Sequence, residues 1–283
     1  QVVGPISCQR PLCAAVGACS ASNPPTGDVC PRLGSVLESR RRFAEAELSY
    51  RQATAVMPQL AEPKTALGML SMRVGRLEDA SRLLDDAFRA DPFHVRVSNM
   101  RKVISLLDEY ATLSTEHFVV RVSAADRVLG HYMVEYLEEI YPQLVEQFGY
   151  EPPHRTPFEV FHNARGLSAH QWFSARMVGL PWVQTIGAST GIVVALSSPS
   201  ASSRPFNWAR VVKHEFVHVI TLQQTGFKIP HWFTEALAVI AEGGTQPLEW
   251  SRLLRERVPA RELYTLETLN DAFARPTSPE DWQ

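Results

Sequence analysis

The sequence predicts an α+β chain, in which an N-terminal α-α repeat module precedes a domain with a small sheet and a long motif-bearing helix. Similar segments recur between positions 33 and 92 with a period of about 34 residues, as in stacked helical hairpins. Downstream, the apolar pattern gives the order strand, helix, strand, strand, helix, which is an α+β arrangement. We therefore divide the chain into an irregular flank over 1–29, helical repeats over 30–112 and a second domain over 113–283.

The composition is that of a soluble globular protein: 283 residues, 45% hydrophobic and 20% charged, with a net charge of −2. No block of basic residues predicts a nucleic-acid partner, and no apolar run is long enough to predict a transmembrane segment. All four cysteines lie in the N-terminal flank or at its end, namely Cys8, Cys13, Cys19 and Cys30. They could form two disulfides in an exported protein or stay reduced in the cytoplasm, so the sequence leaves the compartment open between cytoplasm and periplasm.

The two repeated segments match at their small and apolar positions. The matched pairs are Leu33 with Leu67, Gly34 with Gly68, Phe43 with Leu77, Ala46 with Ala80, Ala53 with Ala87 and Pro58 with Pro92. Glycine and alanine let paired helices approach closely, and proline ends the second helix. This pattern resembles the tetratricopeptide repeat, which implies a module that recruits a protein partner or a substrate. Two repeats are fewer than the roughly three that a stable stack needs, so we expect a helix near 95–110 to cap the array, or the array to lean on the next domain.

The second domain is predicted from runs of β-branched and aromatic residues and from one long amphipathic segment. We expect strands over 117–122, 158–161 and 191–196, and a long helix over about 124–148. The helix that carries the motif is expected to begin near residue 206 or 207.

Residues 214–218 read His-Glu-Phe-Val-His, with the two histidines four positions apart. On a helix, His214 and His218 therefore lie on one face, where two imidazoles can bind a zinc ion. Glu215 is placed to act as the general base that takes a proton from the attacking water. A zinc ion in a hydrolase has three protein ligands and one open position, so a third ligand must come from elsewhere in the chain.

Three sources of the third ligand fit poorly. A metzincin would have a histidine six residues after His218, with a glycine between them. This chain has Gln224 at the position of the histidine and Thr221 at the position of the glycine. A cysteine ligand would have to come from the N-terminal flank, because the last cysteine in the chain is Cys30. Glu249 lies in an imperfect Gly-Thr pattern and stays an open alternative.

The fourth source is Glu235, on the segment that follows the motif helix. Gly226 and Pro230 break the motif helix and start a second helix, which carries Glu235. Two antiparallel helices joined by a short turn would place this carboxylate against the two histidines. That is the gluzincin arrangement of two histidines and a glutamate.

The motif pair HEFVHVITLQ and PHWFTEALA is similar to that of the peptidase MA-like domain, a gluzincin domain of the thermolysin-like zincin fold. Bacterial proteins often carry this domain fused to tetratricopeptide repeats, and the resemblance covers about residues 115–283. It implies a zinc metallopeptidase with one Zn²⁺ held by His214, His218 and Glu235, and with Glu215 as the catalytic base. The family more often has glycine after the third ligand, where this chain has Ala236.

The resemblance also implies how a peptide would bind. The strand before the motif helix is expected to be the substrate-side edge strand, contacting an extended peptide through Gly191, Ile192, Val193, Val194 and Ala195. Tyr264 is a candidate for the residue that stabilises the oxyanion. No Gly-x-Met-Glu-Asn element precedes the motif, which favours an endopeptidase over an aminopeptidase.

Two further expectations concern the whole chain. It ends at SPEDWQ, before the helices that close the cleft in related domains, so we expect the second domain to be truncated at its C-terminus. The alternative function is a catalytically inactive zinc-binding scaffold whose repeats bind a partner. Glu215 favours the enzyme, because a structural zinc site needs no base.

Overall fold

The computed structural model describes residues 29–162, 186–201, 206–244 and 248–274. The described part is a mixed α and β structure, about 66% helical, with one small mixed sheet. Residues 1–28 of the predicted flank, with Cys8, Cys13 and Cys19, lie outside the described residues, and the first described helix begins at Val29 and contains Cys30.

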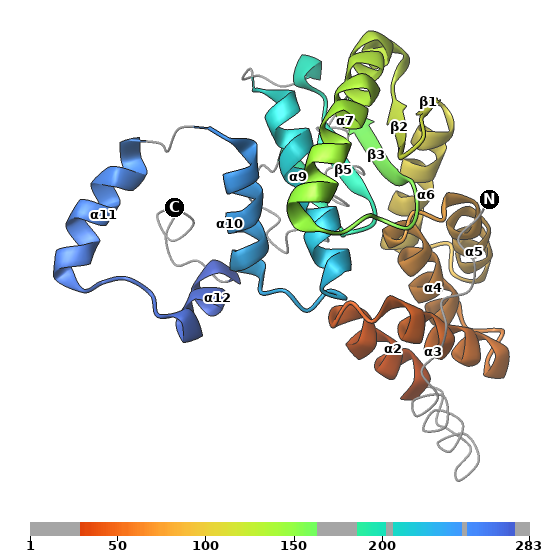
Figure 1. The fold of residues 1–283 in the computed structure, drawn as a ribbon. Helices are drawn as coiled ribbons and strands as arrows, with labels where there is room; N and C mark the ends of the chain where they lie inside the picture. The colour runs from red at the N-terminus through yellow and green to blue at the C-terminus, as the bar shows by residue number, and fades with distance from the viewer. Residues whose placement is uncertain (1–28, 163–185, 202–205, 245–247, 275–283) are drawn as a thin grey trace.

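Four helices form the N-terminal pair of hairpins (Figure 1). They are α2 (Val29–Ser39), α3 (Phe43–Val56), α4 (Ala61–Arg73) and α5 (Leu77–Ala90). The offset between α3 and α5 is the same at their first and last residues, and it equals the repeat period predicted from the sequence. A Cβ added to Gly34 would come within 2.4 Å of Tyr50, and one added to Gly68 within 2.8 Å of Leu84. Glycine at the same repeat position therefore lets each hairpin pack closely.

The next helix, α6 (Val95–Asp108), joins these hairpins to the sheet. One hydrophobic cluster contains apolar residues of α4, α5 and α6 together with Phe161, Ala188 and Ala195 of the sheet. The helical array therefore packs against the sheet together with α6, which is the second of the two arrangements expected from the sequence.

The sheet has five strands in the order β1-β2-β3-β5-β4. They are β1 (Ala111–Ser114), β2 (Phe118–Val122), β3 (Thr156–Phe161), β4 (Gly187–Ser189) and β5 (Val194–Ser197). The central strands β2, β3 and β5 run parallel, and β1 and β4 pair antiparallel at the two edges. The strands predicted over 117–122 and 158–161 are confirmed. β1 and β4 were not predicted, because strands of four and three residues are too short to show an alternation of apolar and polar residues.

The expected edge strand over 191–196 is wrong in two respects. The strand begins only at Val194, and it lies between β3 and β4. Gly191 has a left-handed φ of 84°, and the Thr190 hydroxyl accepts the backbone N–H groups of Ile192 and Val193, so this stretch forms the turn between β4 and β5. Val193, Val194 and Ala195 are fully buried, and the edge next to the motif helix is β4.

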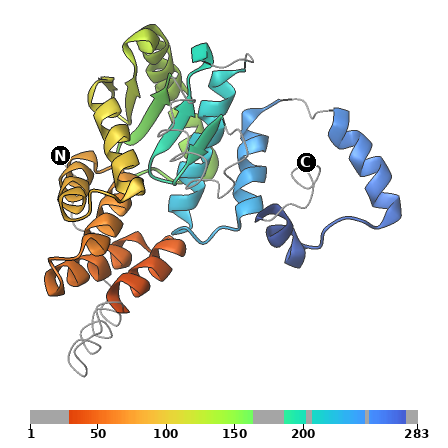
Figure 2. The ribbon, with the colours of Figure 1, turned by 180° about the vertical axis from the view of Figure 1, so that it is seen from behind.

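Helices cover both faces of the sheet (Figures 1 and 2). On one face, α7 (Arg127–Phe148), which follows the 3-10 turn η1 (Ala124–Asp126), and α9 (Trp208–Gln224) share a core with Phe158, Val160 and Leu196. The opposite face, with Phe161 and Ala195, packs on α4–α6. Alternate residues of one strand thus serve different layers, as the pleat of a strand requires. A second 3-10 turn, η3 (Pro199–Ala201), lies between β5 and α9.

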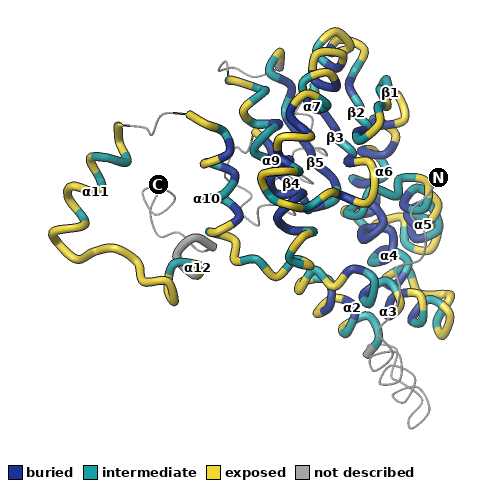
Figure 3. The backbone as a smooth tube through the Cα atoms, viewed as in Figure 1, coloured by how far each residue is buried: buried dark blue, intermediate teal, exposed yellow. Residues whose placement is uncertain are grey.

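The last described helices are α10 (His231–Glu242), α11 (Leu248–Ala260) and α12 (Leu266–Ala274). α10 packs against α9, whereas α11 projects away from the rest and its residues are largely exposed (Figure 3). Asn270 of α12 accepts the backbone N–H of His231 at 3.1 Å, so α12 returns to the start of α10. Among the described helices, none combines the length and the apolar sequence needed to cross a lipid bilayer.

Candidate metal centre

The motif helix α9 is positioned by its cap and by its apolar face. The Asn207 side chain accepts the backbone N–H of Arg210 at 3.3 Å, which is the usual role of asparagine at a helix start. Val212, Phe216 and Val219 lie fully buried in the core shared with the sheet. Because a helix turns about 100° per residue, this packing turns the residues on the opposite side of α9 toward α10.

The turn between α9 and α10 confirms the break predicted from the sequence. Gly226 adopts a left-handed φ of 56°, and Pro230 directly precedes the first residue of α10. Gln224, at the position where a metzincin has its third histidine, donates its amide to the Phe148 carbonyl at 2.7 Å. That side chain therefore ties α9 to the end of α7.

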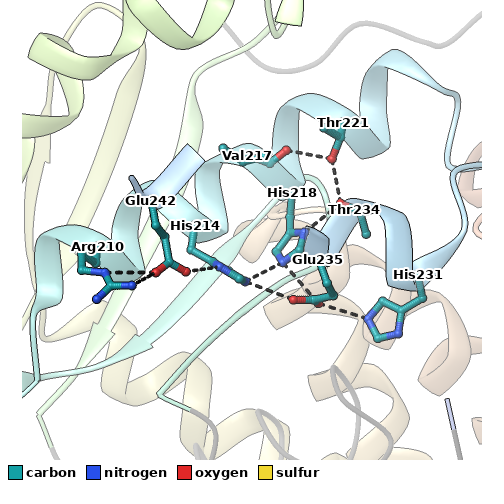
Figure 4. Close-up of polar contacts among 9 residues, drawn as sticks. All are labelled: Arg210, His214, Val217, His218, Thr221, His231, Thr234, Glu235 and Glu242. Carbon is teal, nitrogen blue, oxygen red and sulfur yellow. Dashed lines mark hydrogen bonds and ion pairs between the residues drawn. The ribbon is translucent and has the colours of Figure 1, made fainter. Parts of the chain in front are cut away.

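His214, His218 and Glu235, called the ligand triad below, converge between α9 and α10 (Figure 4). Their candidate ligand atoms all lie within 4.8 Å of one another. The Nε2 atoms of the two histidines are 3.0 Å apart, and the Glu235 carboxylate oxygens lie 3.1 Å from Nε2 of His214 and 3.3 Å from Nε2 of His218. The three side chains could therefore hold one metal ion.

A carboxylate behind His214 orients its ring. Nδ1 of His214 lies 2.7 Å from Oε1 of Glu242, whose other oxygen bonds the Arg210 guanidinium. Burial opposes a charge on His214, but the neighbouring carboxylates of Glu235, Glu215 and Glu242 raise its pKa to about 9. These carboxylates therefore favour a proton on the ring in the metal-free protein, and a divalent cation bound at Nε2 would displace it.

Two threonines set the tautomer of His218. The Thr221 hydroxyl donates to the Val217 carbonyl at 2.8 Å, so it can only accept from the Thr234 hydroxyl, which lies 2.8 Å away. The Thr234 oxygen must then accept from Nδ1 of His218, again at 2.8 Å. Nδ1 therefore carries the proton, and the lone pair of Nε2 points into the ligand triad. This is the tautomer that a metal ligand requires.

Glu215 is the buried acid beside the ligand triad. Its side chain is 6% exposed, and Oε2 has no hydrogen-bond partner within the described part of the chain. Burial raises the pKa of Glu215 to about 8, although the charge of His214 opposes the shift. A Cβ added to Gly187 of β4 would come within 2.7 Å of Oε1, so the carboxylate occupies space that only glycine leaves.

The remaining predicted residues lie around or away from this site. His231 has Nε2 3.3 Å from Oε1 of Glu235 and is partly exposed. Glu249 lies exposed on α11 and is not among the converging groups of the described residues. Tyr264 lies between α11 and α12, and its proposed role stays a prediction.

Thr234, Glu242 and Arg210 belong to this site but were not predicted from the sequence. For Glu242 and Arg210 the available signal was helical spacing, since Glu242 lies two turns after Glu235 and Arg210 one turn before His214, on the same helix faces. Such spacing is common on any helix, which is why the signal was not selective.

Comparison of the chain with protein-family models, with curated proteins and with solved structures found no match.

Proposed function

We propose that this protein is a zinc-dependent metallopeptidase of the gluzincin type. The observation that carries the proposal is the convergence of His214, His218 and Glu235 beside the buried carboxylate of Glu215. Metal binding alone would not call for Glu215, since a buried acid with an unpartnered oxygen costs stability. A group kept at such a cost beside a metal site is a candidate for acid-base chemistry.

The donor set fits zinc. Two imidazoles and one carboxylate, with a fourth position open, are the ligands of catalytic zinc in gluzincins. Both imidazoles have their outer nitrogen engaged, by Glu242 and by Thr234, which is the support that metal-binding histidines usually have.

His214, His218 and Glu235 would hold one Zn²⁺, which would supply a Lewis acid for activating water and polarising a peptide carbonyl. Glu215 accepts the proton of the attacking water and delivers it to the leaving amine. Burial raises the pKa of Glu215 to about 8 without a metal, and a bound Zn²⁺ would lower it toward the range in which the carboxylate can both take and return a proton at neutral pH.

Substrate contacts follow from the corrected sheet order. β4 is the edge of the described sheet next to α9, and its Gly187 lies against Glu215. An extended peptide paired with β4 would pass close to that carboxylate, and main-chain pairing would suit an endopeptidase. The hairpins α2–α3 and α4–α5, as tetratricopeptide-like repeats, would contribute a surface for a substrate or a partner protein.

Glu215→Gln tests the proposal in protein that holds one zinc per chain, measured by elemental analysis. We expect peptide hydrolysis, followed by mass spectrometry on a peptide library, to fall by roughly 10²–10⁴-fold while zinc content is unchanged. Glu256→Gln, the same change at an exposed position of α11, should alter neither quantity. If zinc-loaded wild type cleaves no library member, the inactive scaffold replaces the enzyme as the better interpretation.

A further inference from the structure

A small cavity lies between the end of α2 and the turn that joins α9 to α10. Its volume is about 160 Å³. Arg40 and Arg41 line it from the first hairpin, and Phe227, His231 and Thr234 line it from the other side. The two parts of the chain are held together here by an edge-to-face contact between Phe43 and Phe227, with ring centroids 5.3 Å apart.

This cavity adjoins the ligand triad. Thr234 bonds Nδ1 of His218 at 2.8 Å, and His231 lies 3.3 Å from the Glu235 carboxylate. Two residues of the cavity wall thus contact two metal ligands directly (Figure 4).

Arg41 brings an uncompensated positive charge to the cavity. No carboxylate of the described residues pairs with its partly buried guanidinium. The nearby carboxylate of Glu38 is already used, since it pairs with Arg73 at 3.2 Å and accepts the Tyr50 hydroxyl at 2.8 Å. Burial and the charge of Arg73 lower the pKa of Arg41, so its cationic form is destabilised where it stands. A partly desolvated guanidinium of this kind favours a bound anion.

The internal repeat shows that Arg41 is an unusual residue at its position. Arg41 and Gly75 are one repeat period apart and occupy the same turn in the two hairpins, with left-handed φ values of 57° and 78°. Glycine adopts this conformation without strain, whereas the Cβ of arginine crowds the neighbouring backbone.

Phe227, on the opposite wall, also has a left-handed φ, of 63°. Of the three non-glycine residues with positive φ in the described ranges, two therefore line this one cavity. Strained backbone is concentrated at ligand-binding sites in proteins.

We propose that this cavity is a carboxylate subsite of the peptidase, in which Arg41 binds a carboxylate of the peptide substrate. That the bound peptide is a substrate rests on the proposed function, but the binding of a carboxylate by Arg41 does not. The volume is suited to a carboxylate and its adjoining carbons rather than to a folded partner. The carboxylate is either the C-terminus of the peptide or the side chain of an aspartate or glutamate, since both offer two oxygens to a guanidinium.

Binding of three labelled peptides tests the proposal. The peptides are tetra-alanine with a free C-terminus, its C-terminal amide, and the amide with one alanine replaced by aspartate. Dissociation constants are measured by fluorescence anisotropy on zinc-loaded Glu215→Gln protein, which should bind without cleaving, and on metal-free wild type. The metal-free arm removes direct binding of a carboxylate to zinc and does not depend on any hydrolytic activity.

We expect at least one carboxylate peptide to bind roughly tenfold or more tightly than the neutral amide in both arms. Arg41→Gly should abolish that preference and raise the midpoint of thermal unfolding, because glycine suits the left-handed turn as Gly75 does. Arg42→Ala is the control. It removes the same charge one residue away, from a pair with Glu45 outside the cavity, so it should neither abolish the preference nor raise the unfolding midpoint.

The outcomes separate the two carboxylate sources and the two proposals. If only the peptide with the free C-terminus is preferred, the subsite binds the C-terminal carboxylate and cleavage lies near the carboxyl end of the substrate. If the aspartate peptide is preferred, the subsite binds an acidic side chain. Equal binding of all three peptides in both arms, or a preference that survives Arg41→Gly and Arg41→Ala, would overturn the subsite. A preference lost in Arg41→Gly supports it even if the wild type hydrolyses nothing.

Discussion

The hairpin of α4 and α5 and the hairpin of α9 and α10 have the same construction, but they differ in the side chains that lie between their two helices. Each consists of two consecutive helices packed side by side and joined by a short turn (Figure 1). Between α4 and α5, Gly68 lies against Leu84 in a wholly apolar contact. Between α9 and α10, the facing side chains include two histidines, two threonines and two glutamates.

The difference lies in how each hairpin stabilises the groups between its helices. An apolar contact stabilises a hairpin through its buried area, without further partners. Buried polar groups cost free energy unless each has a partner, and the α9–α10 contact meets that condition through one connected set of hydrogen bonds that reaches from Arg210 to His231. One hairpin therefore contributes mainly stability, and the other brings together groups that could hold a metal ion.

The largest effect is expected from Glu235→Ala, which removes a proposed ligand from the polar hairpin. Zinc affinity should fall by at least about hundredfold, because even residues that only support a ligand account for roughly 10–100-fold. Competition with a chelating dye measures the affinity. Unchanged affinity would show that the third ligand lies elsewhere, and Glu249→Ala would then be the next variant to measure.

Leu84→Ala changes the apolar hairpin instead. Leu84 is fully buried, so its truncation should lower the free energy of unfolding by about 2–5 kcal/mol. Urea unfolding of the metal-free protein measures this loss. Zinc affinity of the folded protein should equal that of the wild type, and a parallel loss of affinity would refute the division of roles between the two hairpins.

Glu242→Gln is the gentlest of the three changes, since it keeps the shape of the side chain and removes its charge. Because Glu242 bonds Nδ1 of His214, we expect zinc affinity to fall by roughly 10–100-fold. Arg210→Gln removes the exposed partner of the same carboxylate and should have a smaller effect. An equal loss in both variants would assign the effect to the Arg210 pair rather than to the orientation of His214.

The elements that the sequence predicted well depend on local patterns. The repeat period and the spacing of His214 and His218 each follow from helical geometry within one element or one repeat. The short strands β1 and β4 escaped prediction because four and three residues carry too little pattern. The error at 191–196 has the same origin: an apolar run marks a buried segment, but its place in the sheet depends on which strands pair with it.

By itself, the sequence determined the motif helix, the break after it and the placing of Glu235 on the next helix, because residues and turn signals only a few positions apart carry that information. Only the tertiary structure decided that β4 is the edge strand, that Gly187 makes room for Glu215 and that Arg41 meets the α9–α10 turn. Arg41 lies far from Phe227 and His231 in the chain. Contacts of that kind depend on how complete layers pack, which no local pattern of residues specifies.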